Sequence, residues 1–199
     1  GDVYKRQNYP MPPKPKGADE GIIKGMYLLR GAPKGDGPLV RLIGSGPIMV
    51  QVLDAVEKLE TYGVRCEIYS ATSYGELRRE GLACDRHNRL HPTDEVQKPY
   101  VETLLAEPLP TVAVSDNMAA VPDMIRQWVS GPYTVLGTDG FGRSDTREAL
   151  RRFFEIDGAA IALAALSSLV REGKIDGKVY AKAAKNFAVS TDRPDIADL

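Results

Sequence analysis

Residues 39–69 read LVRLIGSGPIMVQVLDAVEKLETYGVRCEIY, and this stretch decides the class of fold. It opens with the apolar run 39–43, which predicts a strand, and Pro47 then suits the first position of a helix. That helix has apolar residues at helical spacing, at positions 48, 52, 55, 56 and 59. Gly63 ends the helix, and the alternating run 64–69 predicts a second strand. A helix between two strands predicts parallel pairing through a right-handed crossover.

The same alternation continues toward the C-terminus. Strands are expected at residues 111–114 and 133–136. Helices are expected at residues 74–90 and 118–129, after residue 145, and at 159–170 and 178–187. A short helix is also expected before the first strand, at residues 18–29. The helix at 159–170 is apolar nearly all round, so other elements must cover most of it. Together these patterns predict an α/β protein, a three-layer α/β/α sandwich with a mostly parallel sheet.

Composition excludes several classes of protein. The chain has 199 residues, enough for one domain with a sizeable core, and a formal net charge of −1. This charge gives no electrostatic reason to expect nucleic acid or an acidic membrane as partner. No run approaches the roughly 18 apolar residues of a membrane span, and the N-terminus lacks the apolar centre of a signal peptide. We therefore expect a soluble, cytoplasmic protein whose Cys66 and Cys84 are reduced thiols.

The segment GSGPIM at residues 44–49 occupies the place of a dinucleotide-binding loop, between a strand and a helix. The Rossmann fingerprint requires a third small residue where this chain has Met49, and an acidic residue where it has Ser70. The sequence therefore favours a plain tight turn. A small-ligand or nucleotide-binding domain stays open as a weaker alternative.

The sequence offers no recognisable catalytic centre. The GxSxG, P-loop and HExxH motifs are absent, and no cluster of Cys or His surrounds His87 and His91 that could complete a zinc site. His91 has two interpretations: a general acid–base group, or a residue that orders the turn before Pro92. We assign no catalytic, cofactor-binding or metal-binding residue.

Residues 136–157, LGTDGFGRSDTREALRRFFEID, contain the most unusual loop of the chain. Three glycines fall within residues 137–142, which indicates a turn in a shape that side chains would crowd. Ser144 or Asp145 is expected to cap the following helix, with Glu148 completing a capping-box-like pair if Asp145 is the cap. The charged side chains of this loop indicate a contact surface. The alternative is a tight connection whose charges face water.

Four segments resemble one family, the homodimeric, thiamine-dependent pyruvate dehydrogenase components. They are LGTDGFGRSDTR, SATSYGELRREGLACDRHNRLHP (70–92), AVPDMIRQWVSGPYTVLGTDG (120–140) and NYPMPPKPKGADEGIIKGMY (8–27). The resemblance implies that residues 38–190 are the transketolase C-terminal-like domain. It makes residues 8–37 the end of a preceding domain and a linker, 191–199 a C-terminal tail, and 1–7 (GDVYKRQ) an artefact of cloning or sequence assembly.

The family's function follows as an expectation. The resemblance implies oxidative decarboxylation of pyruvate, with acetyl transfer to a lipoyl group on the dihydrolipoyl acetyltransferase. Thiamine diphosphate and Mg²⁺ are expected in the full-length parent, between domains that precede this one, and none bound by this chain. The chain is then an inactive C-terminal fragment that supplies scaffold and homodimer contacts. The alternative is a free-standing, non-catalytic module that docks a lipoyl-bearing acyltransferase.

Six residues are candidates for an interface or for the wall of the active-site entrance. They are His91, Asp139, Phe141, Arg143, Ser144 and Asp145. The alternative for the five loop residues is loop architecture.

Overall fold

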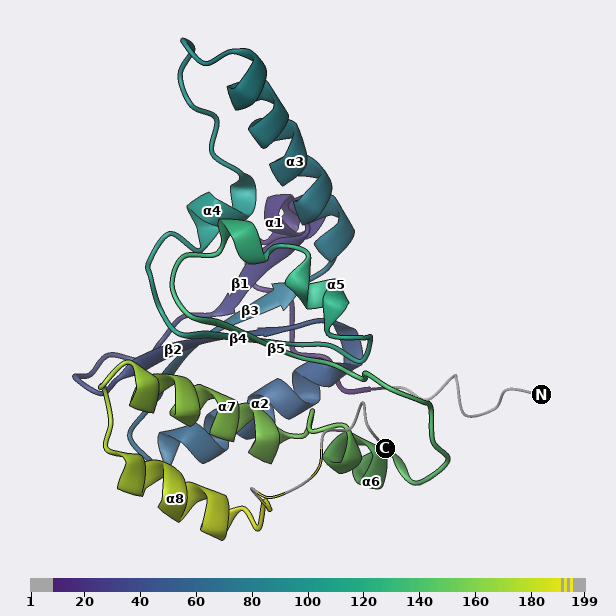
Figure 1. Ribbon diagram of the computed structural model, residues 1–199, viewed down its shortest axis with the longest axis vertical. Coiled ribbons are helices and arrows are strands. Elements are labelled where there is room, and N and C mark those ends of the chain that lie inside the picture. Colours follow the sequence, from purple (N-terminus) through teal and green to yellow (C-terminus); the bar gives the residue numbers. More distant parts are fainter. Residues whose placement is uncertain (1–8, 191, 193, 195–199) are drawn as a thin grey trace.

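The computed structural model describes residues 9–190, 192 and 194 (Figure 1). The expected artefact at 1–7 and most of the expected tail at 191–199 lie outside these residues. The described part contains a five-stranded sheet in the order β1-β3-β2-β4-β5. The strands are β1 (Met26–Arg30), β2 (Leu39–Gly44), β3 (Arg65–Ala71), β4 (Thr111–Val114) and β5 (Tyr133–Leu136).

β2 lies at the centre of the sheet, where Leu42 faces Ile68 of β3 on one side and Val112 of β4 on the other. The pairs among β2, β3, β4 and β5 are parallel, and β1 is antiparallel to β3. All four strands expected from the apolar runs are present. The mostly parallel sheet is confirmed.

Helices cover both faces of the sheet (Figure 1). On one side lie α2 (Met49–Glu60), α7 (Gly158–Arg171) and α8 (Gly177–Asn186), which share a core of buried aliphatic side chains. On the other side lie α3 (Tyr74–Leu90), α4 (Tyr100–Leu104) and α5 (Ala120–Asp123), over a second core with more aromatic rings. The three-layer α/β/α sandwich is confirmed. The sequence patterns did not indicate α4.

The helix expected at 18–29 is wrong in its second half. Helix α1 (Asp19–Lys24) ends at Gly25, whose φ of 104° is left-handed, and strand β1 follows at once. A Cβ at Gly25 would lie 2.6 Å from the carbonyl oxygen of Ser73, so the turn needs glycine. The segment 8–37, expected as the end of a preceding domain and a linker, contributes β1 to this sheet, and residues 31–38 connect β1 to β2.

The helix expected at 118–129 is also wrong as a single element. The chain forms α5 and then the 3₁₀ turn Arg126–Trp128, with Ile125 and Trp128 buried. The expected helix at 74–90 runs unbroken through Gly81, as α3. Glycine is needed there because a Cβ would lie 2.7 Å from the ring of Trp128.

Residues 147–171 are apolar and long enough, by composition alone, to span a bilayer. This is weak evidence, because the core helix of a soluble protein passes the same test. The segment comprises two helices, α6 (Arg147–Phe153) and α7, and the apolar side chains of α7 pack in the core with those of α2 and the sheet.

Candidate functional site

The loops that follow β4 and β5 are fastened together at the carboxyl edge of the sheet. The Thr138 amide donates to the Asn117 carbonyl oxygen at 3.0 Å, and the Ala119 amide donates to Asp139 Oδ1 at 3.1 Å. Gly137 permits this contact, since a Cβ there would lie 2.3 Å from the Ala119 nitrogen. The glycine-rich loop is therefore held in one place by the neighbouring loop.

The fastened loops present two apolar side chains to solvent. Phe141 is 87% exposed and Met118 is 57% exposed. Exposed apolar side chains, above all an aromatic ring on a glycine-rich loop, are typical of a contact surface. We call Met118, Asp139, Phe141, Arg143 and Asp145 the loop surface.

The cap of α6 corrects the sequence-based interpretation. Thr146 is the N-cap, and its Oγ1 accepts a hydrogen bond from the Ala149 amide at 3.2 Å. The sequence predicts Ser144 or Asp145 as the cap; Asp145 instead accepts from the Thr146 amide at 2.6 Å. The helix begins later than expected because Thr146 itself keeps an extended backbone, with φ −63° and ψ 154°.

The structure gathers five of the six sequence-predicted candidates on one loop and separates the sixth. Arg143 lies over the Phe153 ring at 4.7 Å, and Ser144 is exposed beside Asp145. His91 is the C-cap of α3, far from this loop (Figure 1). Its ring stacks on that of His87 with centroids 4.6 Å apart, and its Nδ1 is 3.8 Å from Asp94.

Helix α6 adds two arginines that are not among the candidates predicted from the sequence. Arg147 and Arg151, spaced i and i+4, lie over the ring of Tyr9 at 4.5 and 5.8 Å. Shielding from water raises the pKa of the nearby Asp116 carboxyl, and the charges of Arg151 and Arg147 oppose this rise. The i, i+4 spacing indicates that the two arginines share one face of the helix. No sequence pattern predicts their contact with Tyr9.

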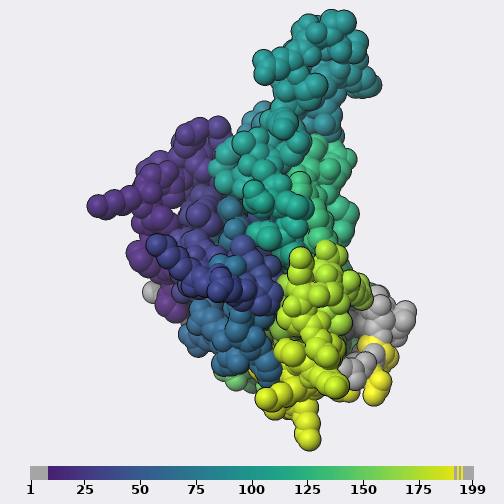
Figure 2. Space-filling view, turned by 90° about the vertical axis from the view of Figure 1, so that its left-hand side faces the viewer, coloured from purple at the N-terminus to yellow at the C-terminus, as the bar shows by residue number. Residues whose placement is uncertain are grey.

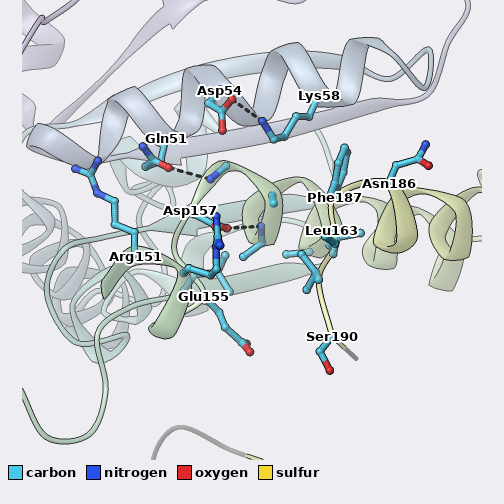
Figure 3. Close-up of a pocket in the computed structure, with 18 of the residues that line it drawn as sticks. Gln51, Asp54, Lys58, Arg151, Glu155, Asp157, Leu163, Asn186, Phe187 and Ser190 are labelled. Atoms are coloured by element: carbon cyan, nitrogen blue, oxygen red, sulfur yellow. Dashed lines mark hydrogen bonds and ion pairs between the residues drawn. The ribbon is translucent and has the colours of Figure 1, made fainter. Parts of the chain in front are cut away.

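A hollow of about 970 Å³ lies between α2, α6, α7 and the end of α8 (Figure 3). On its α2 wall, Lys58 Nζ is 2.6 Å from Asp54 Oδ1, and Gln51 Oε1 accepts from the Gly158 amide at 3.1 Å. On its α7 wall, Asp157 Oδ1 accepts from the Ala160 amide at 2.8 Å and caps the helix. The Gln51–Gly158 bond joins α2 to α7, and the other two contacts stabilise α2 and α7 individually, so these side chains have structural roles.

The GSGP turn shows why no dinucleotide fingerprint is present. Gly44 rather than a later glycine gives the close helix contact, because a Cβ there would lie 2.8 Å from Val52 and 3.0 Å from Met49. Ser45 Oγ donates to Ser115 Oγ at 3.4 Å, just after the carboxyl ends of the adjacent parallel strands β2 and β4. The chain moves from β2 to β3 on one side and then returns to β4 on the other, so the strand order reverses between these two strands. The two hydroxyls bond to each other across this point.

The chain matches one family model, described as a transketolase-like TK C-terminal domain, over residues 25–157. The chain belongs to this family. The match begins one residue before β1 and ends at the cap of α7, so it includes all five strands and the loop surface. The transketolase C-terminal fold therefore accounts for the whole sheet, including its antiparallel edge.

Two curated relatives are named pyruvate dehydrogenase E1 component. That of Pseudomonas aeruginosa is 45% identical over 96% of this chain, and that of Escherichia coli K12 is 44% identical over 94%. The matched regions are 22% and 21% of those relatives, so this transketolase-type chain spans about a fifth of their length. Among solved structures, a transketolase of Pichia stipitis superposes with a TM-score of 0.52 at 19% identity, over 79% of this chain and 20% of that one. This second likeness supports the fold alone.

Proposed function

We propose that this chain serves as the C-terminal domain of a thiamine diphosphate-dependent pyruvate dehydrogenase component. The observation that carries the proposal is the identity of about 45% with proteins of that name along nearly the whole chain. Such an enzyme decarboxylates pyruvate oxidatively and passes the acetyl group to a lipoyl group of the acetyltransferase. In this proposal the enzyme is a cytoplasmic homodimer.

The cofactor would be held outside this domain. Among residues 9–190, no three His, Cys, Asp or Glu side chains gather in a way that could hold a metal ion. In this proposal the thiamine diphosphate and Mg²⁺ lie between the domains that precede this one, and we assign no catalytic step to the described residues. The domain contributes scaffold and contact surface to the proposed enzyme.

The loop surface is the proposed contact with the rest of that enzyme. Phe141 has the largest exposed fraction among the large apolar side chains of the described residues, and the bonds to Asn117 and Ala119 already hold its loop in place. A loop that is ordered before contact loses less conformational entropy when it binds. Arg143 and Asp145 add charged groups to the loop surface, and charges at the edge of an interface determine which partner binds.

A chimera tests the function. This chain replaces the matching segment of the Pseudomonas aeruginosa relative, and pyruvate-dependent CO₂ release is measured with thiamine diphosphate, Mg²⁺ and ferricyanide as electron acceptor. We expect turnover within about ten-fold of the parent, since exchanged domains of one family keep most contacts. A soluble, folded chimera without turnover contradicts the proposal.

Two substitutions in the chimera test the loop surface. Phe141→Ser with Arg143→Glu should reduce turnover or dimerisation at least about ten-fold. Lys174→Glu, an exposed charge beyond the end of α7, is the matched control and should change neither. Normal dimerisation and turnover of the double variant would contradict a contact role for the loop surface and leave it a purely structural role.

A second candidate function is a free-standing module that docks a lipoyl-bearing acetyltransferase. The exposure of Phe141 and Met118 in the isolated chain favours it. Calorimetric titration of the isolated chain with dihydrolipoyl acetyltransferase distinguishes the two. Binding lost in Phe141→Ser, combined with an inactive chimera, would favour the docking module.

A further inference from the structure

Helix α3 projects beyond the sheet as an arm (Figures 1 and 2). Its first half is anchored, with Leu77 fully buried and Gly81 against Trp128. Asp85 closes the anchor by accepting hydrogen bonds from Trp128 Nε1 at 3.2 Å and from Gln127 at 3.0 Å. From Asp85 onward no side chain is buried before Pro99.

Local bonds hold the tip of the arm in shape. The Asn88 side-chain amide donates to the Gln97 carbonyl oxygen at 2.9 Å, and its Oδ1 accepts from the Gln97 amide at the same distance. This pair of bonds ties the returning segment to the helix. The arm is therefore ordered without a core of its own, which lowers the entropic cost of contact with a partner.

One face of α3 combines leucines with arginines. At 100° per residue, Arg78, Leu82, Arg86, Arg89 and Leu90 fall within an arc of about 120°. Leu82 is 40% exposed and Leu90 is 52% exposed, and the three arginines are exposed as well. We call these five residues the Arg–Leu face.

The carboxylates of α3 are engaged elsewhere and do not neutralise this face. Glu76 pairs with Arg79, and Glu80 accepts from the Tyr100 amide at 3.0 Å. Asp85 is bound to Trp128. Within the described residues, the guanidinium groups of Arg78, Arg86 and Arg89 make no hydrogen bond, ion pair or ring contact. The face therefore presents three available cations around two leucines.

We propose that the Arg–Leu face docks onto an acidic surface with an apolar centre, within the part of the longer enzyme that this chain does not span. The inference rests on the proposed function. The chain spans about a fifth of its relatives' length, so most of such an enzyme lies outside it. Guanidinium groups bind carboxylates in paired hydrogen bonds, and the leucines bury apolar area between them.

Hydroxyl-radical footprinting of the free chain and of the chimera tests this docking directly. Oxidation of Leu82 and Leu90 should fall at least about five-fold in the chimera, because docking removes both from solvent. Equal oxidation in the two proteins overturns the inference, whether or not the chimera turns over. An inactive chimera with both leucines protected rejects the proposed function and keeps the docking.

Charge reversal gives a second readout. The triple variant Arg78→Glu, Arg86→Glu, Arg89→Glu should weaken dimerisation or turnover of the chimera at least about ten-fold, and the loss should shrink as salt rises. The control reverses three exposed lysines at the opposite end of the molecule, with Lys174→Glu, Lys178→Glu and Lys182→Glu, and should have little effect. Unchanged melting of the free triple variant verifies that it folds. A triple variant equal to the control overturns the inference.

An anionic membrane is the competing partner for a basic face. The free chain is sedimented with vesicles of phosphatidylglycerol and, as a control, of phosphatidylcholine. Arginine-dependent binding to phosphatidylglycerol alone, with unprotected leucines in the chimera, would assign the face to lipid and overturn the protein contact.

Discussion

Tyr74 and Tyr133 are buried in the same core on the α3 side of the sheet, and they differ in one hydrogen bond. The hydroxyl of Tyr133 donates to the Pro122 carbonyl oxygen at 2.7 Å. In the described part of the chain, the Tyr74 hydroxyl has no hydrogen-bond partner. Burial raises the pKa of both side chains, so both hydroxyls remain protonated at neutral pH.

Tyr74→Phe removes a buried hydroxyl without a partner, and we expect the free energy of unfolding to rise by about 1 kcal/mol. Tyr133→Phe, the matched control, should lower the free energy of unfolding by about 1 kcal/mol, because the hydrogen bond to Pro122 is lost. Urea unfolding followed by tryptophan fluorescence measures both. Equal losses in the two variants would contradict the assignment of Tyr74 as unpartnered.

Gly81 and Gly75 lie on the same helix with different surroundings. Gly81→Ala places a methyl group against Trp128, so we expect a loss of roughly 1–3 kcal/mol of stability despite the better helix propensity of alanine. Gly75→Ala, whose Cβ would meet nothing closer than Ser73 Oγ at 3.9 Å, should be neutral or stabilising. Thermal melts compare the two. A Gly81→Ala variant as stable as Gly75→Ala would refute the tight Trp128 contact.

Cys66 makes stability depend on pH above neutrality. Burial raises the pKa of this thiol from 9.0 to about 12. The unfolded chain therefore loses the proton near pH 9 while the folded chain keeps it, so stability falls as pH rises from about 9 to about 12. At about pH 10.5 this amounts to roughly 2 kcal/mol. Urea unfolding at pH 8 and 10.5 should show a smaller loss in Cys66→Ala. Equal losses would exclude the thiol as the cause.

At the scale of elements, helix α6 is capped by Thr146 and not, as the sequence predicted, by Ser144 or Asp145. Thr146→Ala should destabilise α6 by about 1 kcal/mol, because its Oγ1 satisfies the Ala149 amide. Asp145→Ala should cost less, since among the described residues that carboxylate bonds only the neighbouring Thr146 amide. Hydrogen exchange of the first-turn amides measures the difference. Faster exchange in Asp145→Ala than in Thr146→Ala would restore Asp145 as the cap.

The strands and long helices could be predicted because their apolar residues repeat at the period of the element. β1 could not, because its side chains also fit the end of a helix, and the left-handed turn at Gly25 decides between them. The 118–129 segment has helical spacing, yet its chain turns so that Trp128 packs on Gly81. Both errors arise where a tertiary contact overrides a local pattern.

The sequence predicted the shaped, glycine-rich loop of the candidate site, and it did not predict which distant residues lie near that site. The glycine cluster indicated a shaped turn, and the structure shows it fastened through Gly137 to Ala119. The meeting of Tyr9 with Arg147 depends on the path of the chain around the whole molecule. His91, placed in the same candidate set, lies at the tip of the α3 arm instead.

At the scale of the whole molecule, two exposed features lie at opposite ends: the loop surface beside α6 and the Arg–Leu face on the α3 arm (Figure 1). Both are ordered by polar contacts and carry apolar side chains in solvent. This arrangement suits a domain that is covered by other parts of a larger enzyme. In the proposed enzyme the two features make separate contacts.

The isolated chain should then neither decarboxylate pyruvate nor bind thiamine diphosphate. Calorimetric titration with thiamine diphosphate and Mg²⁺ should give no heat of binding, because in the proposed enzyme the cofactor lies between the domains that precede this one. The active chimera is the positive control. Micromolar binding by the isolated chain would show that the domain contributes a cofactor site of its own.

The most direct test of the central claim is the DNA sequence on the 5′ side of the Asn8 codon in the source genome. We predict a continuous reading frame that adds about four fifths of the relatives' length and encodes the preceding, cofactor-binding domains that the family resemblance implies. An in-frame stop followed by a start codon immediately upstream would contradict it and make this domain a separate protein.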